Sequence, residues 1–314
     1  MPTSTSLYPT FMEKLSIALD WTPNTNHAGL FLAQQQGLYA AAGLQVTLRS
    51  PEADAYAITP ARRLLAGEVE LAVASSETVL SYRTAATPVE VTAVAALLQG
   101  DTSAIAVLAA SGIERPAQLD GRIYGSYQAR FEDHIVRELV KNDGGQGSLV
   151  IEYPPKLAIW DQLLQGQVAA TWIFLGWEGA LAQLAHVALR TFSLGDYGIP
   201  YGYTPVLVST PHLLTTKRDA LTRLLAATEA GYQLAAADPA AAAQLLAQTG
   251  LPAFANTAFV QASLTQLQPH FLTQAGRWGT MQQARWSAFV HWLVEKGLLT
   301  PTAYTAPEKL FVNL

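Results

Sequence analysis

Apolar and polar residues alternate from residue 15 to residue 20, in the segment LSIALD. An alternation of period two predicts a half-exposed β-strand. The turn residues Pro23 and Asn24 follow, and apolar residues at helical spacing then predict a helix that begins near His27 and ends at Gly37. The first strand thus ends directly before a polar loop, which is where open α/β sheets bind ligands.

Strand-like and helix-like segments alternate along most of the chain, which predicts α/β architecture with sheets covered by helices. One series runs to about residue 100, and a second series starts with the strand-like segment 103–109. The segment 203–210 has the pattern of a strand that returns to the first series. The chain after Lys217 is predicted to be helical, with helices at residues 218–238, 239–248, 256–271 and 281–297.

This order of segments predicts two lobes, because the second series is inserted into the first. We expect lobe I at residues 14–104 and 206–314, and lobe II at residues 105–205. The two crossovers should lie near residues 102–106 and 203–207. Two lobes joined by two hinges form a clamshell that can close on a ligand.

Composition removes several classes of function. The 314 residues carry a formal net charge of -5, which gives no basic surface for nucleic acid. The chain has no cysteine, so disulfides, thiolate nucleophiles and cysteine-bound metals are excluded. The six histidines are scattered, and none has the spacing of a zinc motif. We therefore expect no metal site and no cofactor, while a catalytic pair of carboxylates stays open on composition alone.

The beginning of the sequence bears on location. MPTSTSLYPTFMEK has neither the basic region nor the apolar run of a secretory signal, and no segment has the length of an apolar membrane span. We expect an extracytoplasmic protein if a leader was removed, and a cytoplasmic one if the sequence is the native full length.

Several segments resemble a known family, in the right order over nearly the whole chain. They are LDWTPNTNHAGLFLAQQQGLYAAAGLQV, VELAVASSETVLSYR, TWIFLGWEG, YGYTPVLV and RWGTMQQARWSAFVHWLVEKGLL. Together they look like the SsuA/THI5-like family, and most like its thiamine-pyrimidine-precursor binding proteins of ABC importers. The resemblance implies the two-lobed type II periplasmic binding protein fold. It also implies non-covalent binding of a formylaminopyrimidine or hydroxymethylpyrimidine by closure, as a monomer that serves ABC membrane subunits if exported.

Two other functions remain as alternatives. Fungal-type pyrimidine synthases of this family need a lysine and a histidine where this chain has Ala74 and Thr78, and a cysteine-rich run that is missing here. A Schiff base needs an amine, so the departure argues against a cytosolic synthase or salvage enzyme. The second alternative keeps the fold and binds a sulfonate or another small anion, which would need Arg130 or helix amino termini to hold its charge.

The first strand–helix junction holds an indole, two amides and an imidazole. Trp21 can stack on a flat ring, while Asn26 and His27 can contact its polar edge. Asp20 is a weaker candidate, because it can equally cap backbone amides of the loop. After the strand VELAVA, Ser76 is either an N-cap or a ligand contact, and Glu77 can accept from an amino group on the ring.

The remaining candidates come from lobe II and the return crossover. Tyr127 can close over the second face of the ring, and ordinary loop packing is the equal alternative. Arg130 and Glu132 are expected to be surface charges unless the ligand is anionic. The other candidates are Trp172, Glu178, Tyr201 and Tyr203. In the helical tail, Trp278, Trp286 and Trp292 are expected to be core residues.

Overall fold

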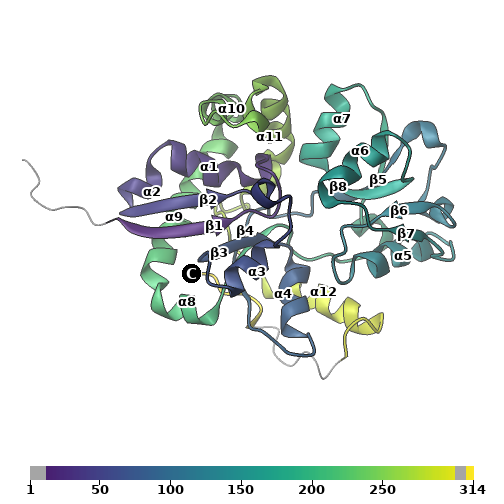
Figure 1. Ribbon diagram of the computed structural model, residues 1–314, viewed down its shortest axis with the longest axis horizontal. Coiled ribbons are helices and arrows are strands. Elements are labelled where there is room, and N and C mark those ends of the chain that lie inside the picture. The colour runs from purple at the N-terminus through teal and green to yellow at the C-terminus, as the bar shows by residue number, and fades with distance from the viewer. Residues whose placement is uncertain (1–11, 301–308) are drawn as a thin grey trace, which may run out of the picture.

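The protein consists of two α/β lobes side by side, as Figure 1 shows for the computed structural model. The structure describes residues 12–300 and 309–314, so the amino-terminal stub discussed above lies largely outside the described residues. Each lobe is built on a five-stranded sheet, and two chain segments connect the sheets. We call the first sheet with its helices lobe I and the second sheet with its helices lobe II.

The sheet of lobe I has the order β2-β1-β3-β10-β4. Strand β1 pairs in parallel with β2 and β3, whereas β10 runs antiparallel between β3 and β4. The return strand predicted in 203–210 is therefore confirmed as part of the first sheet. The strands are β1 (Glu13–Ala18), β2 (Leu44–Arg49), β3 (Leu71–Ala74), β4 (Thr92–Ala96) and β10 (Val206–Ser209).

The sheet of lobe II has the order β7-β6-β8-β5-β9. Strand β6 is parallel to β7 and β8, whereas β5 is antiparallel to β8 and β9. In both sheets the parallel strands send their carboxyl ends toward the space between the lobes (Figure 1). The strands are β5 (Ser103–Leu108), β6 (Ile123–Gly125), β7 (Val150–Glu152), β8 (Ala170–Phe174) and β9 (Leu189–Phe192).

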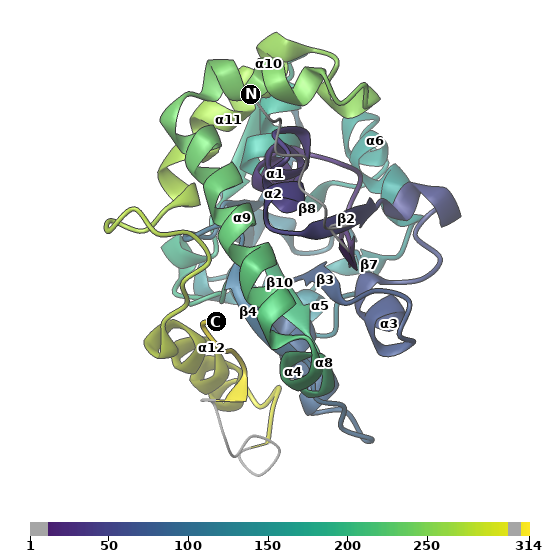
Figure 2. The same ribbon diagram turned by 90° about the vertical axis from the view of Figure 1, so that its left-hand side faces the viewer.

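The helices cover the sheets, and those of the carboxyl-terminal half pack on lobe I (Figures 1 and 2). Lobe II carries α5 (Glu132–Asn142), α6 (Ile159–Leu164) and α7 (Ala180–Leu184). The helices of lobe I are α1 (Ala28–Gln35), α2 (Leu38–Ala41), α3 (Pro60–Leu65), α4 (Ser76–Arg83), α8 (Pro211–Thr216), α9 (Arg218–Ala237), α10 (Pro239–Ala247), α11 (Thr257–Phe271) and α12 (Gln283–Glu295). Among the described residues, no helix is long and apolar enough to cross a membrane.

Helices α1 and α9 approach each other closely enough to bring their backbones into contact. A Cβ at Gly29 would overlap the ring of Tyr232, and a Cβ at Gly231 would overlap the backbone carbonyl of Gly29. Glycine at both positions allows this approach, and Tyr232 is fully buried in it. The long helix α9 thereby fixes the start of α1, which follows the first strand–loop junction (Figure 2).

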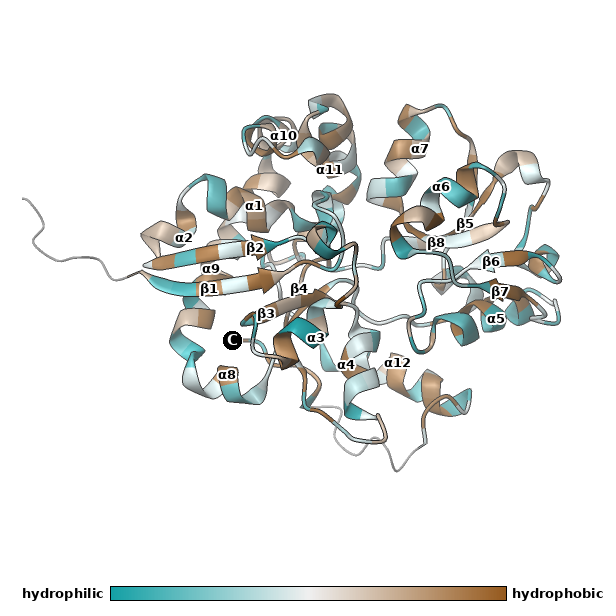
Figure 3. Cartoon of the chain, in the orientation of Figure 1, coloured by the Kyte–Doolittle hydropathy of each residue, from teal (hydrophilic) through white to brown (hydrophobic). Residues whose placement is uncertain are grey.

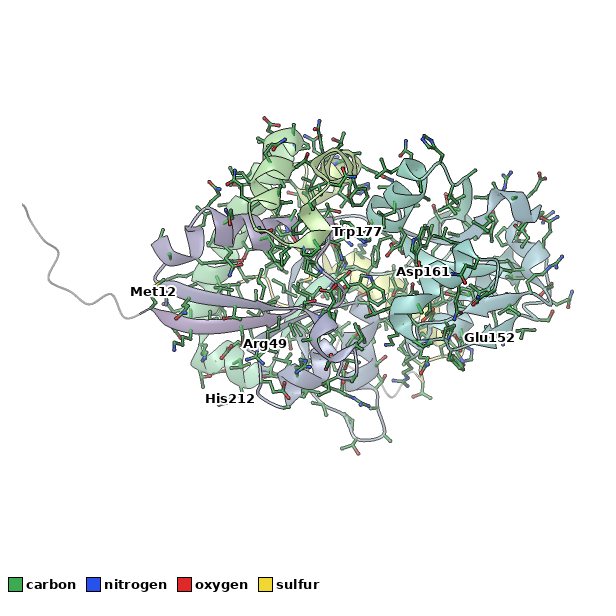
Figure 4. The ribbon with its side chains drawn as sticks, turned by 45° about the horizontal axis from the view of Figure 1, so that its top comes forward. Met12, Arg49, Glu152, Asp161, Trp177 and His212 are labelled. Atoms are coloured by element: carbon green, nitrogen blue, oxygen red, sulfur yellow. The ribbon has the colours of Figure 1, made fainter. Side chains whose placement is uncertain are left out.

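Apolar side chains fill the strands and the inner faces of the helices, and hydrophilic residues gather on the outer turns (Figure 3). The three tail tryptophans are buried, as predicted. Trp177 lies where the lobes meet (Figure 4) and contacts Phe259 of α11 with ring centroids 4.9 Å apart. The core of lobe I therefore continues across the junction into lobe II.

The structure differs from the sequence prediction in a few elements. The connections between the sheets are residues 97–102 and 193–205, slightly earlier in the chain than expected. Strand β9 was not predicted, because LRTF is short and only its last residue is fully buried. Helix α8 precedes Lys217 and was not predicted. Residues 272–282 lie between α11 and α12, where Gly279 forms a bridge with Ala96. The domain limits themselves stay predictions.

Candidate functional site

A cavity of about 710 Å³ lies between the lobes and is lined by residues of both. This volume is within the usual range for small-molecule sites. Side chains from lobe I include Asp20, Trp21, Tyr56, Arg62, Glu77, Thr78 and Tyr82. Side chains from lobe II and the return connection include Tyr127, Arg130, Glu132, Lys156, Trp172, Glu178 and Tyr201.

The loop after β1 is held by its own polar side chains. Asn24 caps the 3₁₀ turn Thr25–His27, and its side chain accepts from Asn26 N at 2.9 Å. Asn24 N donates to His27 Nδ1 at 3.4 Å, so Nδ1 is the acceptor and Nε2 carries the proton. Nε2 therefore donates to Asp20 Oδ1 at 2.7 Å. The fully buried imidazole holds the Asp20 carboxyl group, which faces the cavity.

The same loop is anchored to the carboxyl-terminal helices of lobe I. The Tyr232 hydroxyl of α9 donates to Asn26 O at 2.6 Å, and Thr25 Oγ1 lies 2.5 Å from Ser263 Oγ of α11. These bonds satisfy buried polar groups that would otherwise destabilise the fold. The position of Trp21 and Asp20 thus depends on residues more than 200 positions later in the sequence.

Aromatic rings from the two lobes meet in the cleft. Trp21 of lobe I contacts Tyr127 of lobe II edge to face, with centroids 5.6 Å apart and an interplanar angle of 84°. The ring centroids of Tyr56 and Trp21 are 5.8 Å apart. Lys156 Nζ of lobe II lies 4.6 Å from the centroid of the Tyr56 ring. Both Trp21 and Tyr127 are partly exposed, so their rings are available to a flat ligand.

The first junction of lobe II is organised by Glu132. One carboxylate oxygen accepts from Tyr124 Oη at 2.8 Å and Tyr127 N at 3.0 Å, and the other accepts from Ala129 N at 3.2 Å. Burial raises the pKa of Glu132, and these hydrogen bonds oppose that shift. Both oxygens of this carboxylate are hydrogen-bonded within the loop that carries Tyr127.

Glu77 connects both lobes and the return connection. It projects from the first turn of α4, and its Oε1 accepts from Phe131 N of lobe II at 2.5 Å. The Tyr201 hydroxyl donates to its Oε2 at 3.3 Å. In the opposite direction, Arg130 of lobe II donates to Ser81 O at 3.2 Å and Thr84 Oγ1 at 2.6 Å on lobe I. Burial raises the pKa of Glu77 to about 7, and the nearby charge of Glu132 adds to the shift.

Glu178 enters the cavity from the π-turn Leu175–Gly179 that follows β8. It is buried, and its Oε2 accepts from Phe174 N at 3.0 Å. Burial raises the pKa of Glu178 to about 7; the bond from Phe174 opposes the shift, and the charge of Asp20 adds to it. Carboxyl groups from opposite lobes therefore interact electrostatically across the cavity.

The structure brings six of the ten predicted site residues into the cavity wall: Trp21, Glu77, Tyr127, Trp172, Glu178 and Tyr201. The other four lie behind it. Asn26 and His27 are buried in the capped loop, and Ser76 is buried beside Gly202. The Tyr203 hydroxyl accepts from Gln282 N at 3.0 Å, and Arg285 lies 4.3 Å above its ring. The N-cap of α4 is Ser75, one residue before the predicted position.

Several side chains of the wall were missed or ranked low from the sequence. Asp20 was a weak candidate, and its hydrogen bond with the His27 imidazole is visible only in the folded loop. Glu132 was expected to be a surface charge, but it is buried, because its carboxylate is bonded within its own loop. Tyr56 and Lys156 lie in segments without a clear period, so no sequence pattern marked them. Ala55 and Tyr56 both have positive φ, of 52° and 63°, which is unusual for residues with a side chain. Ala74 and Thr78 both line the cavity, so the places of the synthase lysine and histidine hold neither an amine nor an imidazole.

The described part of the chain contains no group of three or more His, Asp or Glu side chains arranged to hold a metal ion. What the cavity offers instead is aromatic surface together with carboxyl groups. It is suited to holding a planar ligand with hydrogen-bond donors on its edge.

Comparison with known proteins agrees with this arrangement. The family described as NMT1/THI5 like matches residues 24–242. A Haemophilus influenzae protein whose name assigns it to thiamine biosynthesis is 28% identical over 207 residues, which is 66% of this chain and 64% of that protein. A formylaminopyrimidine-binding protein of Halalkalibacterium halodurans is 23% identical over 287 residues, which is 90% of this chain and 85% of that protein. The chain thus spans slightly less than two thirds of the first relative and most of the second.

Solved structures share the fold at low sequence identity. The alkanesulfonate-binding protein SsuA of Xanthomonas axonopodis pv. citri, bound to MOPS, superimposes with a TM-score of 0.70 at 18% identity, covering 96% of this chain and 98% of that one. The periplasmic nitrate-binding protein NrtA of Synechocystis PCC 6803 does so with a TM-score of 0.71 at 12% identity, covering 96% and 86%. The chain belongs to the NMT1/THI5-like family and has the type II periplasmic binding protein fold, the fold of substrate-binding proteins of ABC importers.

Proposed function

We propose that the protein binds a pyrimidine precursor of thiamine non-covalently, by closing its lobes on the ring. The observation that carries the proposal is the pair Trp21 and Tyr127, which meet at 5.6 Å from opposite lobes beside the carboxylate of Asp20. A flat heterocycle can lie against the indole, while its amino group donates to a carboxyl group of the wall. The formylaminopyrimidine-binding relative supports this choice of ligand.

The wall is rich in acidic groups, which favours a ligand with donors over an anion. Asp20, Glu77, Glu132 and Glu178 all line the cavity. Of the arginines there, Arg130 already donates to Ser81 and Thr84. A sulfonate would have to enter next to these carboxyl groups, and like charges at this range repel. The anion-binding alternative therefore has less support than the pyrimidine.

Catalysis is not part of the proposal. Ala74 and Thr78 supply neither the amine nor the imidazole of the synthase reaction, and the chain has no cysteine. We propose instead that the closed form, held by Glu77 and Arg130 across the lobes, is what ABC membrane subunits recognise in an exported, extracytoplasmic monomer.

Calorimetry with four ligands tests the proposal: formylaminopyrimidine, hydroxymethylpyrimidine, pyridoxal phosphate and an alkyl sulfonate. We expect one or both pyrimidines to bind, and the other two compounds to give little heat. Small-angle scattering should show a smaller radius of gyration with the bound pyrimidine. Binding of pyridoxal phosphate alone, with an imine absorbance band, would contradict the proposal, and so would preference for the sulfonate.

A further inference from the structure

Asp20 and Glu178 approach the same cavity from opposite lobes. Asp20 follows β1 of lobe I, and Glu178 lies in the π-turn after β8 of lobe II. Asp20 Oδ1 is held by His27 Nε2 at 2.7 Å, and Glu178 Oε2 accepts from Phe174 N at 3.0 Å. A second backbone hydrogen bond, from Glu178 itself, also reaches the Glu178 carboxyl group. Closure therefore brings two acids from opposite lobes toward the same space.

Two of the three cations that line the cavity contact other groups. Arg130 donates to lobe I, and Lys156 lies over the Tyr56 ring, whereas Arg62 is exposed at the rim. Within residues 12–300 and 309–314, no lysine or arginine forms an ion pair with Asp20 or Glu178. The other titratable or charged groups that line the cavity are Tyr56, Arg62, Glu77, Tyr82, Tyr127, Glu132 and Tyr201. Of these, the acids add to the negative potential and Arg62 reduces it, so repulsion among the acids opposes closure without a ligand.

We propose that this acid pair binds a nitrogen base together with one proton, so that the occupied cleft holds a cationic heterocycle between Asp20 and Glu178. The inference rests on the proposed function and narrows its ligand class to basic heterocycles. The proton comes from solvent and is shared between a ring nitrogen and a carboxyl group, and no other bond changes. A protonated ring nitrogen beside an exocyclic amino group presents two parallel N–H donors, which match a carboxylate.

Two properties follow for selectivity. Neutral rings without a basic nitrogen cannot remove the repulsion between the acids, and anions increase it. Closure therefore depends on the charge of the ligand. Only a ligand that is protonated, or becomes protonated on binding, offsets the repulsion between the two acids in the closed form. Because burial raises the pKa of Glu178 to about 7, the free protein at pH 8 is mostly unprotonated there, and the proton has to be taken up on binding.

The test is calorimetry of the full chain with formylaminopyrimidine at pH 8, in phosphate and in Tris, whose ionisation enthalpies differ. The dependence of the observed heat on the buffer gives the number of protons taken up. We expect uptake close to about one proton per ligand, and affinity that falls up to about tenfold per pH unit above this pH. At pH 6 the uptake should be smaller, because part of the proton is already bound.

Glu178→Gln and Asp20→Asn should each reduce the uptake to roughly half or less and flatten the pH dependence of affinity. The matched ligand control is an aminobenzyl formamide, in which CH groups replace both ring nitrogens. It should bind more weakly and without proton uptake.

The outcomes separate the two proposals. Tight binding of formylaminopyrimidine by the wild-type chain with no buffer dependence would overturn the proton-linked site and leave the proposed function standing. Proton uptake equal to that of the wild type in both Glu178→Gln and Asp20→Asn would also overturn it. If neither formylaminopyrimidine nor hydroxymethylpyrimidine binds, the proposed function fails, and this inference fails with it.

Discussion

The first strand–helix junctions of the two lobes face each other across the cleft and use the same kinds of side chain differently. Each presents one aromatic ring, Trp21 in lobe I and Tyr127 in lobe II, and each contains a carboxyl group beside the ring. In lobe I the carboxylate of Asp20 is held by a buried imidazole and keeps its free side for the cavity. In lobe II both oxygens of the Glu132 carboxylate accept hydrogen bonds from backbone amides of its own loop.

The difference indicates a division of labour. In the lobe I junction, buried hydrogen bonds hold Asp20 in place while its carboxyl group lines the cavity. It can therefore accept hydrogen bonds from the polar edge of a ligand. The lobe II junction has its polar groups paired internally and offers mainly a ring, and its next residues, Arg130 and Phe131, hold lobe I instead. We infer that the lobe I junction acts mainly in ligand selection and the lobe II junction mainly in closure. Glu178, which lies outside that junction, adds an acid of lobe II to the site. Four substitutions test this contrast.

The largest effect is expected from Glu132→Ala, which should destabilise the lobe II junction. Two backbone amides and the Tyr124 hydroxyl lose their acceptor. We expect the free energy of unfolding to fall by roughly 3–4 kcal/mol, because these buried donors are left unpaired. Denaturant titration measures it. Glu132→Gln keeps one acceptor oxygen and should lose less, and equal stability of Glu132→Ala and wild type would show that the loop does not need the carboxylate.

The second prediction concerns pH and Glu77, the acid that joins the lobes. Its pKa is about 7 in the folded protein, against an ordinary value near 4.5 in the unfolded chain, so folding favours its protonated form. Its contribution to stability is fully present below about pH 4.5 and is lost as the pH rises through about 7. Glu77→Gln should remove up to roughly 3 kcal/mol of this pH dependence.

Unfolding titrations at pH 5 and pH 8 measure that change. The matched control is Glu90→Gln, whose side chain is 64% exposed and paired only loosely with Arg83. It should leave the pH dependence as in the wild type. An unchanged pH dependence in Glu77→Gln would mean that Glu77 is hydrated in the folded protein.

Trp21→Ala tests directly whether the lobe I junction contributes to ligand affinity. Removing the indole should weaken pyrimidine binding by about 2 kcal/mol, roughly 30-fold, because the ring loses its stacking surface. Stability should change little, since Trp21 is partly exposed. Trp160→Ala in lobe II is the control, because Trp160 is half-buried and lies outside the cavity wall. Retained affinity in Trp21→Ala would remove the indole from the site.

The smallest effect is expected from Arg130→Ala. It removes the bonds to Ser81 and Thr84, which cross between the lobes at an exposed position. We expect affinity to fall about fivefold, near 1 kcal/mol, through a more open free state. The control is Arg137→Ala in α5 of lobe II, whose guanidinium donates to Gly147 O of its own lobe. A larger loss than in Trp21→Ala would reverse the proposed division of labour.

Most of the fold could be predicted from the sequence because the signals are local. Alternation in LSIALD, the stop at Gly37 and the apolar return strand each depend on neighbouring residues. The four-residue strand β9 was missed, since its pairing with β5 and not a local pattern determines it.

The site was predicted less completely, because sequence position does not give side-chain direction. Asn26 and His27 lie at the expected junction, yet the cap made by Asn24 turns both into the protein. The exposed partner of that imidazole is Asp20, which sequence reasoning ranked lower. Tyr56 reaches the cavity only because the chain takes a left-handed conformation at two successive residues, which no periodicity signals.

The backbone contact between α1 and α9 limits how this protein can acquire a new ligand. No side chain fits at Gly29 or Gly231, and Tyr232 of α9 holds the carbonyl of Asn26. A single substitution at this contact would reduce the free energy of unfolding without giving the loop a new conformation. Divergence in nature and selection in the laboratory should therefore accumulate changes around residues 55–57 and 127–130, while the loop after β1 stays fixed. A mutant library restricted to those two segments would sample new specificities without disturbing the anchored half of the cleft.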